Sequence, residues 1–142
     1  MKKFLVPVDG STAALRALAA AAELAKADPA ASLHLVHCHE EPLVYGEIAV
    51  YVPRDKMEAA QKAHSDGILE RAMAEADRSG VRCTREVLTG PIGPTIAAHA
   101  DKLGCDAIVM GRHGRTMLND LLVGSVAQKV LHASKLPVML VR

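Results

Sequence analysis

Three glycines and a serine in the last third of the chain are spaced as a phosphate site requires. Gly111 and Gly114 lie three positions apart, and Gly124-Ser125 follows after nine further residues. Glycine lets the backbone approach a ligand without a Cβ in the way, and successive N–H groups in such turns form anion-binding nests. Ser125 opens a predicted helix, whose free N–H groups and positive end favour the same anion. These residues therefore predict binding of phosphate.

The same glycines have a structural interpretation, because glycine is common after strands and before helices. The spacing of all four residues favours the phosphate interpretation. Arg112, His113 and Arg115 add positive charge beside them. The chain has neither the lysine-containing P-loop nor the G-x-G-x-x-G dinucleotide fingerprint. A phosphate site here would belong to another class.

The elements that must position these residues alternate between short apolar strands and helices. We predict strands at 4–8, 33–38, 81–88, 106–110 and 136–141, and helices at 11–27, 55–79, 95–103 and 124–133, with a long loop at 40–54. Continuously apolar strands suit a parallel sheet with helices on both faces, joined by right-handed crossovers. The expected fold is one doubly wound α/β domain over residues 1–142, its five-stranded parallel sheet ordered 3-2-1-4-5.

A second polar segment, Pro7-Val8-Asp9-Gly10-Ser11, follows the first predicted strand. Ligands of doubly wound sheets bind beyond the carboxyl ends of the strands, where the strand order reverses. We therefore expect Asp9 to contact the ligand of the glycine cluster. The alternative is that Asp9 only caps the following helix.

These segments resemble a known family. The pattern Gly111-x-x-Gly114-x(9)-Gly124-Ser125 is similar to the G-x(2)-G-x(9)-G-[ST] ATP-binding signature of the universal stress protein family. The resemblance extends over essentially the whole chain, through the segments 5–11, 36–38, 106–111 and 137–141.

The resemblance implies an ATP-binding regulatory protein of the stress response. We expect Mg²⁺ to accompany the nucleotide through phosphate oxygens and water, which needs few protein ligands. The resemblance places the nucleotide on Pro7, Val8, Asp9, Cys38, Met110, Gly111, Arg112, His113, Gly114, Gly124, Ser125 and Val126. The first four residues would lie at the adenosine end, and the glycines with Ser125 would hold the triphosphate. Cys38 departs from the family pattern, which usually has an apolar residue there. The resemblance also implies a homodimer through the C-terminal strand, Pro137 to Val141.

Two other functional classes stay open. The first is a slow ATPase or phosphotransferase that uses the same site, although a P-loop lysine, a water-orienting glutamine and paired metal-binding carboxylates are not evident in the sequence. We assign no catalytic residue. The second is a redox or flavin module on a similar sheet, which a bound yellow cofactor would reveal.

The composition limits which binding partners and which cellular compartment we expect. The 142 residues carry a formal charge of +1 and only 2% aromatic side chains, which gives no reason to expect nucleic acid as a partner. No run approaches the roughly 20 apolar residues of a membrane span. Cys38, Cys83 and Cys105 form no C-x-x-C pair, so we expect free thiols and a cytoplasmic location.

The remaining candidates have simpler interpretations. His37, His39 and Glu40 would share a sheet edge, but the sequence does not supply a full set of zinc ligands beside them. Cys38 has no assured base to make it a nucleophile. His99 and His132 fall on predicted helices, where we interpret them as partly buried side chains without a further role.

Overall fold

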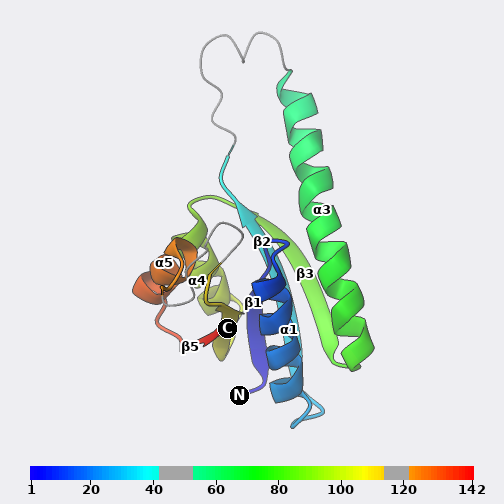
Figure 1. Ribbon diagram of the computed structural model, residues 1–142, viewed down its shortest axis with the longest axis vertical. Coiled ribbons are helices and arrows are strands. Elements are labelled where there is room, and N and C mark those ends of the chain that lie inside the picture. Colours follow the sequence, from blue (N-terminus) through cyan, green and yellow to red (C-terminus); the bar gives the residue numbers. More distant parts are fainter. Residues whose placement is uncertain (42–52, 114–121) are drawn as a thin grey trace.

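The computed structural model describes residues 1–41, 53–113 and 122–142. One parallel sheet has the predicted order β3-β2-β1-β4-β5 (Figure 1). Its strands are β1 (Lys3–Pro7), β2 (Ser32–His39), β3 (Arg82–Thr89), β4 (Ala107–Gly111) and β5 (Val138–Val141). The described helices are α1 (Thr12–Ala25), α3 (Arg54–Ser79), α4 (Ile92–Lys102) and α5 (Ser125–Ala133).

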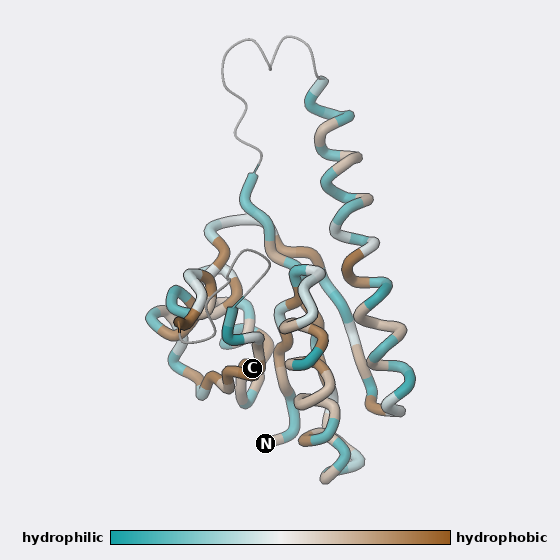
Figure 2. The backbone as a smooth tube through the Cα atoms, in the orientation of Figure 1, coloured by the Kyte–Doolittle hydropathy of each residue, from teal (hydrophilic) through white to brown (hydrophobic). Residues whose placement is uncertain are grey.

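The sheet separates two hydrophobic cores. Phe4 and Val6 of β1 pack with α1 and α3 on one face, whereas Leu5 packs with α4 and α5 on the other. This alternation follows from the two-residue period of a strand. In Figure 2 the colours along the helices alternate between apolar and hydrophilic residues, as expected for helices that cover a sheet on one side. The fold is therefore the predicted doubly wound α/β arrangement.

Local chemistry sets the ends of α1 and α3. The Ser11 hydroxyl accepts a hydrogen bond from the Ala14 amide at 3.1 Å, which caps α1. Gly80 ends α3 with a φ of 74°, a left-handed conformation that glycine adopts without steric cost. The start of α1 lies one residue after the predicted start, and α3 ends at the predicted residue, Ser79.

The start of α4 differs from the expectation. The helix begins at Ile92, three residues before the predicted Thr95, so that Gly93 and Pro94 lie in its first turn. Proline is tolerated there because its missing N–H has no intrahelical partner to lose. The Thr95 amide donates to the Pro91 carbonyl at 2.9 Å, one turn back.

The sheet edge at β5 begins later than predicted. Pro137 precedes the strand, and its carbonyl accepts a hydrogen bond from the Ile108 amide of β4 at 2.9 Å. A proline at this position costs no ladder donor on an edge strand. Residues 138–141 then pair with β4 on one side only within the described sheet.

Helix α3 is supported over only part of its length. Its buried residues, Ser65, Leu69, Ala72 and Ala76, all lie from Ser65 onward, and the N-terminal part of the helix extends past the end of the sheet (Figure 1). None of the described helices combines the length and the apolar character needed to cross a bilayer.

Candidate functional site

A cavity of about 540 Å³ opens at the carboxyl ends of β1, β2 and β4. Its size lies within the range of roughly 300–1,000 Å³ that is common for small-molecule sites. The lining residues come from both faces of the sheet and from all four described helices: Pro7, Val8, Asp9, Ser11, Ala14, His37, Cys38, His39, Glu40, Gln61, His64, Ile92, Ile96, Met110, Gly111, His113, Gly124, Ser125, Val126 and Ala127.

The end of β1 is held by its neighbours. The Val8 amide donates to the Val36 carbonyl at 2.8 Å, and Asp9 Oδ1 accepts from the Ser11 amide at 2.9 Å. Since Ser11 supplies the side-chain cap of α1, Asp9 is not the capping residue. The Asp9 carboxylate instead stabilises the turn that leads into α1, and Asp9 also lines the cavity.

Two glycines of the cavity lie where no Cβ fits. A Cβ on Gly111 would come within 2.9 Å of Ala13 Cβ and 3.0 Å of the Ala13 carbonyl carbon. A Cβ on Gly124 would come within 2.9 Å of His113 Cα, a backbone atom that cannot simply rotate away. The Gly124 amide also donates to the Arg112 carbonyl at 2.8 Å, so the turn after β4 and the start of α5 form one closely packed unit.

The N-terminus of α5 faces the cavity. Ser125, Val126 and Ala127 all line it, and Gly124 at the cap provides no side-chain hydrogen bond. The first turn also has no acidic residue to compensate the positive end of the helix dipole. Because the first amides of a helix have no intrahelical acceptor, this turn can donate to an anion.

Histidines, rather than lysine or arginine, supply the basic side chains on the described wall of the cavity. His37 is buried and its Nδ1 donates to the Val8 carbonyl at 2.8 Å. The His37 ring centroid lies 6.3 Å from that of His39 and 6.0 Å from that of His64 on α3. Burial lowers the pKa of His37, and the charges of the two neighbouring histidines act in the same direction. An anion bound on this part of the wall would therefore be held mainly by backbone groups.

Cys38 lies at the end of β2 as a buried free thiol. Burial raises its pKa to about 11. A thiol in this state is a poor nucleophile at neutral pH, because the thiolate is the reactive form. Its place in the wall is that of a small apolar residue.

The structure brings most of the predicted residues to this one cavity. Those that line it are Pro7, Val8, Asp9, Cys38, Met110, Gly111, His113, Gly124, Ser125 and Val126. Arg112 is not part of the lining, although its carbonyl holds Gly124. Gly114 and Arg115, together with most of the long loop at 40–54, lie outside the described residues.

Sequence reasoning missed the walls that helices contribute. Gln61 and His64 reach the cavity from α3, and Ile92 and Ile96 from α4. Gln61, His64 and Ile96 fall within predicted helices, but a helical pattern does not tell which residues reach the end of the sheet. Ile92 precedes the predicted helix 95–103 and gave no signal. For His37 the sequence favoured a packed or hydrogen-bonded side chain over a metal ligand, and its hydrogen bond to Val8 agrees with this, but its place in the cavity wall was not predicted.

The whole chain, residues 1–142, matches the sequence model of the universal stress protein family. The chain belongs to the universal stress protein family. Among its curated relatives, universal stress protein YxiE of Bacillus subtilis is 35% identical over 146 residues, which cover 99% of this chain and 98% of that protein.

Solved structures of other proteins share the fold of this universal stress protein. The structure of MJ0577, a universal stress protein of Methanocaldococcus jannaschii, has a TM-score of 0.84 at 28% identity and covers 99% of this chain and 94% of its own. A universal stress protein of Archaeoglobus fulgidus in complex with dAMP has a TM-score of 0.70 at 23% identity, covering 100% and 98%. At that identity the likeness shows the fold alone.

Proposed function

We propose that this universal stress protein binds ATP in the cavity. Its adenosine would lie toward the ends of β1 and β2, and its phosphates between the turn after β4 and the start of α5. One observation carries the proposal: the N-terminus of α5, which has no side-chain cap, lines the cavity beside the turn after β4, where Gly111 and Gly124 let the backbone pack more closely than any Cβ would allow. Backbone donors at a helix N-terminus suit phosphate oxygens.

The other walls fit the rest of the nucleotide. Val8, Cys38 and Met110 offer apolar surface for adenine, and Asp9 supplies an acceptor close to them. Mg²⁺ would be carried by phosphate oxygens and water and needs few protein ligands. The Archaeoglobus fulgidus protein of the same fold holds dAMP, which supports an adenine nucleotide as the class of ligand.

We assign the site a regulatory role in the stress response, in which nucleotide occupancy alters contacts with partners. The described cavity contains two lining carboxylates, Asp9 and Glu40, but no lysine or arginine to stabilise a transferring phosphoryl group. Slow hydrolysis or phosphotransfer at the same site is the alternative. The free thiols of Cys38, Cys83 and Cys105 fit the cytoplasmic location expected from the sequence.

We further propose a homodimer through Pro137 to Val141. In the described sheet β5 is an edge strand, and Met139 on it is 44% exposed. An apolar edge strand with unpaired backbone groups is a template for pairing with another chain. A second copy of β5 would cover it.

The test of ATP binding places a charge in the proposed phosphate site. Val126 lines the cavity, is 36% exposed and lies in the first turn of α5, where an aspartate favours the helix. Val126→Asp should therefore fold normally while repelling phosphate, by about 4 kcal/mol per unit charge at 4 Å near a protein surface. The matched control is Leu131→Asp on the same helix, because Leu131 is 44% exposed and does not line the cavity.

Titration calorimetry on nucleotide-free protein should show ATP binding at least tenfold weaker in Val126→Asp and unchanged in Leu131→Asp. Adenosine, which has no phosphate, should lose much less affinity in Val126→Asp than ATP does. Equal ATP affinity in all three proteins would refute the site. A time course of phosphate release, compared with Val126→Asp prepared in the same way, distinguishes hydrolysis from binding alone.

A further inference from the structure

Three metal-ligating side chains meet in a cluster that nucleotide binding does not use. His34 of β2, Glu86 of β3 and His99 of α4 come from segments far apart in the sequence. One ligand atom from each lies within 4.8 Å of the others. None of the three lines the cavity described above.

We propose that His34, Glu86 and His99 form a binding site for Zn²⁺. Two imidazole nitrogens and one carboxylate are the donor set of zinc sites that keep a fourth position open for water. Magnesium and calcium prefer oxygen ligands, so a set with two histidines selects against them.

The separation of His34 from Glu86 suits a small cation. His34 Nε2 lies 3.3 Å from Glu86 Oε2, close to the roughly 3.3 Å that separates two ligands of a tetrahedral zinc with bonds of about 2.0–2.1 Å. His99 Nε2 lies 2.7 Å from the same oxygen, yet this contact does not have the geometry of a hydrogen bond. Within the described residues the buried nitrogen of His99 therefore has a nearby carboxylate but no hydrogen-bond acceptor. A cation among the three groups would satisfy it.

A neighbouring hydroxyl orients one of the ligands. His34 Nδ1 lies 2.6 Å from Thr84 Oγ1, which can accept the proton of that nitrogen. Nε2, which lies within hydrogen-bonding distance of Glu86 Oε2 in the structure, would then turn its lone pair to a bound cation. Metal-bound histidines commonly donate their other ring N–H in this way, and such outer partners affect the affinity for metal.

His34 is buried, at 7% exposed, so a cation bound to its ring nitrogen would be largely shielded from bulk water.

The site would join three elements. The β2–β3 register pairs His34 with Thr84 and Val36 with Glu86, so both strands present their ligands on the face covered by α4. A bound cation would tie the edge strand β3 to α4. We therefore expect Zn²⁺ both to bind and to raise the thermal stability of the protein.

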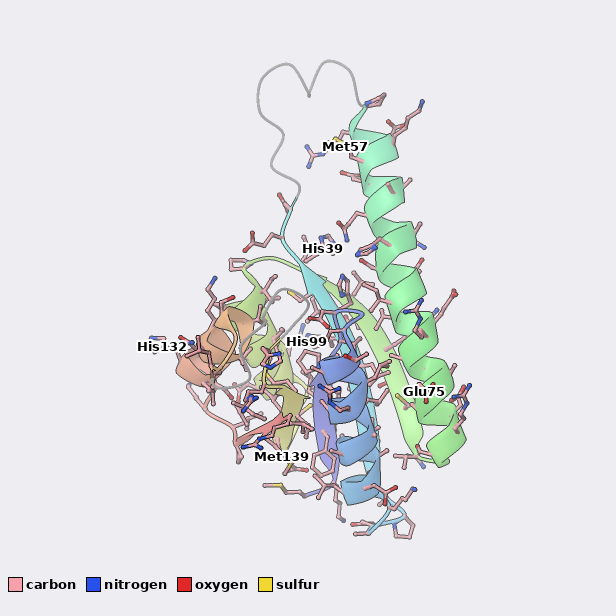
Figure 3. All side chains as sticks on the ribbon, in the orientation of Figure 1. His39, Met57, Glu75, His99, His132 and Met139 are labelled. Carbon is pink, nitrogen blue, oxygen red and sulfur yellow. The ribbon has the colours of Figure 1, made fainter. Side chains whose placement is uncertain are left out.

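The test uses Glu86→Gln and His99→Gln, with His132→Gln as the control. Glu86 is exposed, so Glu86→Gln removes the charge with little effect on folding. His132 lies on the exposed outer side of α5, well apart from His99 in Figure 3. Calorimetric titration of reduced, nucleotide-free protein with ZnCl₂ should give one tight site per chain in the wild type and in His132→Gln. Both cluster variants should bind at least tenfold more weakly.

Two further readouts identify the ligands. Co²⁺, used in place of Zn²⁺, should give the visible bands of a tetrahedral site in the wild type and lose them in Glu86→Gln. Added Zn²⁺ should raise the melting temperature of the wild type and of His132→Gln, but of neither cluster variant.

Several outcomes would overturn the site: a wild type that binds no stoichiometric Zn²⁺, a Glu86→Gln variant that keeps wild-type affinity, or a strong near-ultraviolet sulfur-to-cobalt band, which would place the metal on a cysteine. If His99→Gln does not fold by circular dichroism, the comparison of Glu86→Gln with His132→Gln decides.

Discussion

The close approach of Gly124 to the turn after β4 makes Gly124→Ala a sensitive probe of the proposed phosphate site. The new Cβ would lie 2.9 Å from His113 Cα and 3.1 Å from His113 Cβ. Carbon atoms pack best at about 3.5–4.0 Å, so the turn and the helix would have to separate by about 0.6 Å or more. The φ of Gly124 is −64°, which alanine adopts freely, so any effect arises from this contact and not from backbone strain.

The separation should cost both stability and affinity. Overpacking typically costs about 1–3 kcal/mol, to which the poorer N-cap propensity of alanine adds. Moving the α5 amides relative to the turn would misalign at least one hydrogen bond to a charged phosphate, worth about 1.5–3 kcal/mol. We therefore expect ATP to bind roughly ten- to a hundredfold more weakly, measured by titration calorimetry at a temperature where the variant is folded.

Gly67→Ala is the matched control. Gly67 lies within α3, and a Cβ there would meet no atom within 4 Å. This variant should gain about 0.5–1 kcal/mol of stability in urea unfolding, because alanine is the better helix former, and should keep its ATP affinity. A Gly124→Ala protein that is destabilised as expected but binds ATP like the wild type would refute the reasoning, since the cradle would then not contact the nucleotide.

Burial lowers the pKa values of His34 and His37, so the unfolded chain binds more protons than the folded one just below the ordinary histidine pKa of about 6.5. The free energy of unfolding in urea should therefore fall as the pH is lowered through about 6.5, and a profile that is flat or rises would contradict this. Burial also raises the pKa of Cys38 to about 11, so mass spectrometry should show iodoacetamide labelling it far more slowly in the folded protein than in urea; equal rates would show that the thiol is accessible. Met139→Glu on β5 should shift sedimentation of the proposed dimer to the monomer, whereas Leu24→Glu, at the comparably exposed end of α1, should not; a wild type that is already monomeric would exclude the dimer.

Much of the fold could be predicted because local sequence chemistry and packing agree. The apolar run of β4 is buried on both faces, as its composition indicates. Ser11 and Gly80 end their helices with interactions that neighbouring residues alone decide. The start of α4 was less predictable, since Pro94 is compatible both with a loop and with the first turn of a helix.

The candidate site was predictable only in part. The ends of parallel strands meet at one edge of the sheet, which brings Asp9 and Gly111 to the same cavity without knowledge of any side-chain packing. The contribution of His64 depends on how α3 is rotated against the sheet. The cluster of His34 and His99 depends on the β2–β3 register and on the placement of α4, so our interpretation of His99 as a partly buried side chain without a further role did not consider this cluster.

The uneven support of α3 has a consequence for hydrogen exchange. Amides between Ser65 and Ala76 lie in the part of α3 that packs on the sheet, so they should exchange only when the domain unfolds. Amides near Arg54 and Glu58 are backed by a surface ion pair of 3.0 Å, which contributes little, and should exchange through local fraying. Gln61, which donates to Ser65 Oγ at 3.1 Å, lies where the two regimes meet and also lines the cavity. A ligand that contacts Gln61 would move the boundary between the protected and the fraying part of α3 toward the start of the helix. Deuterium uptake along α3 would therefore report whether the cavity is occupied, without a label on the protein or the ligand.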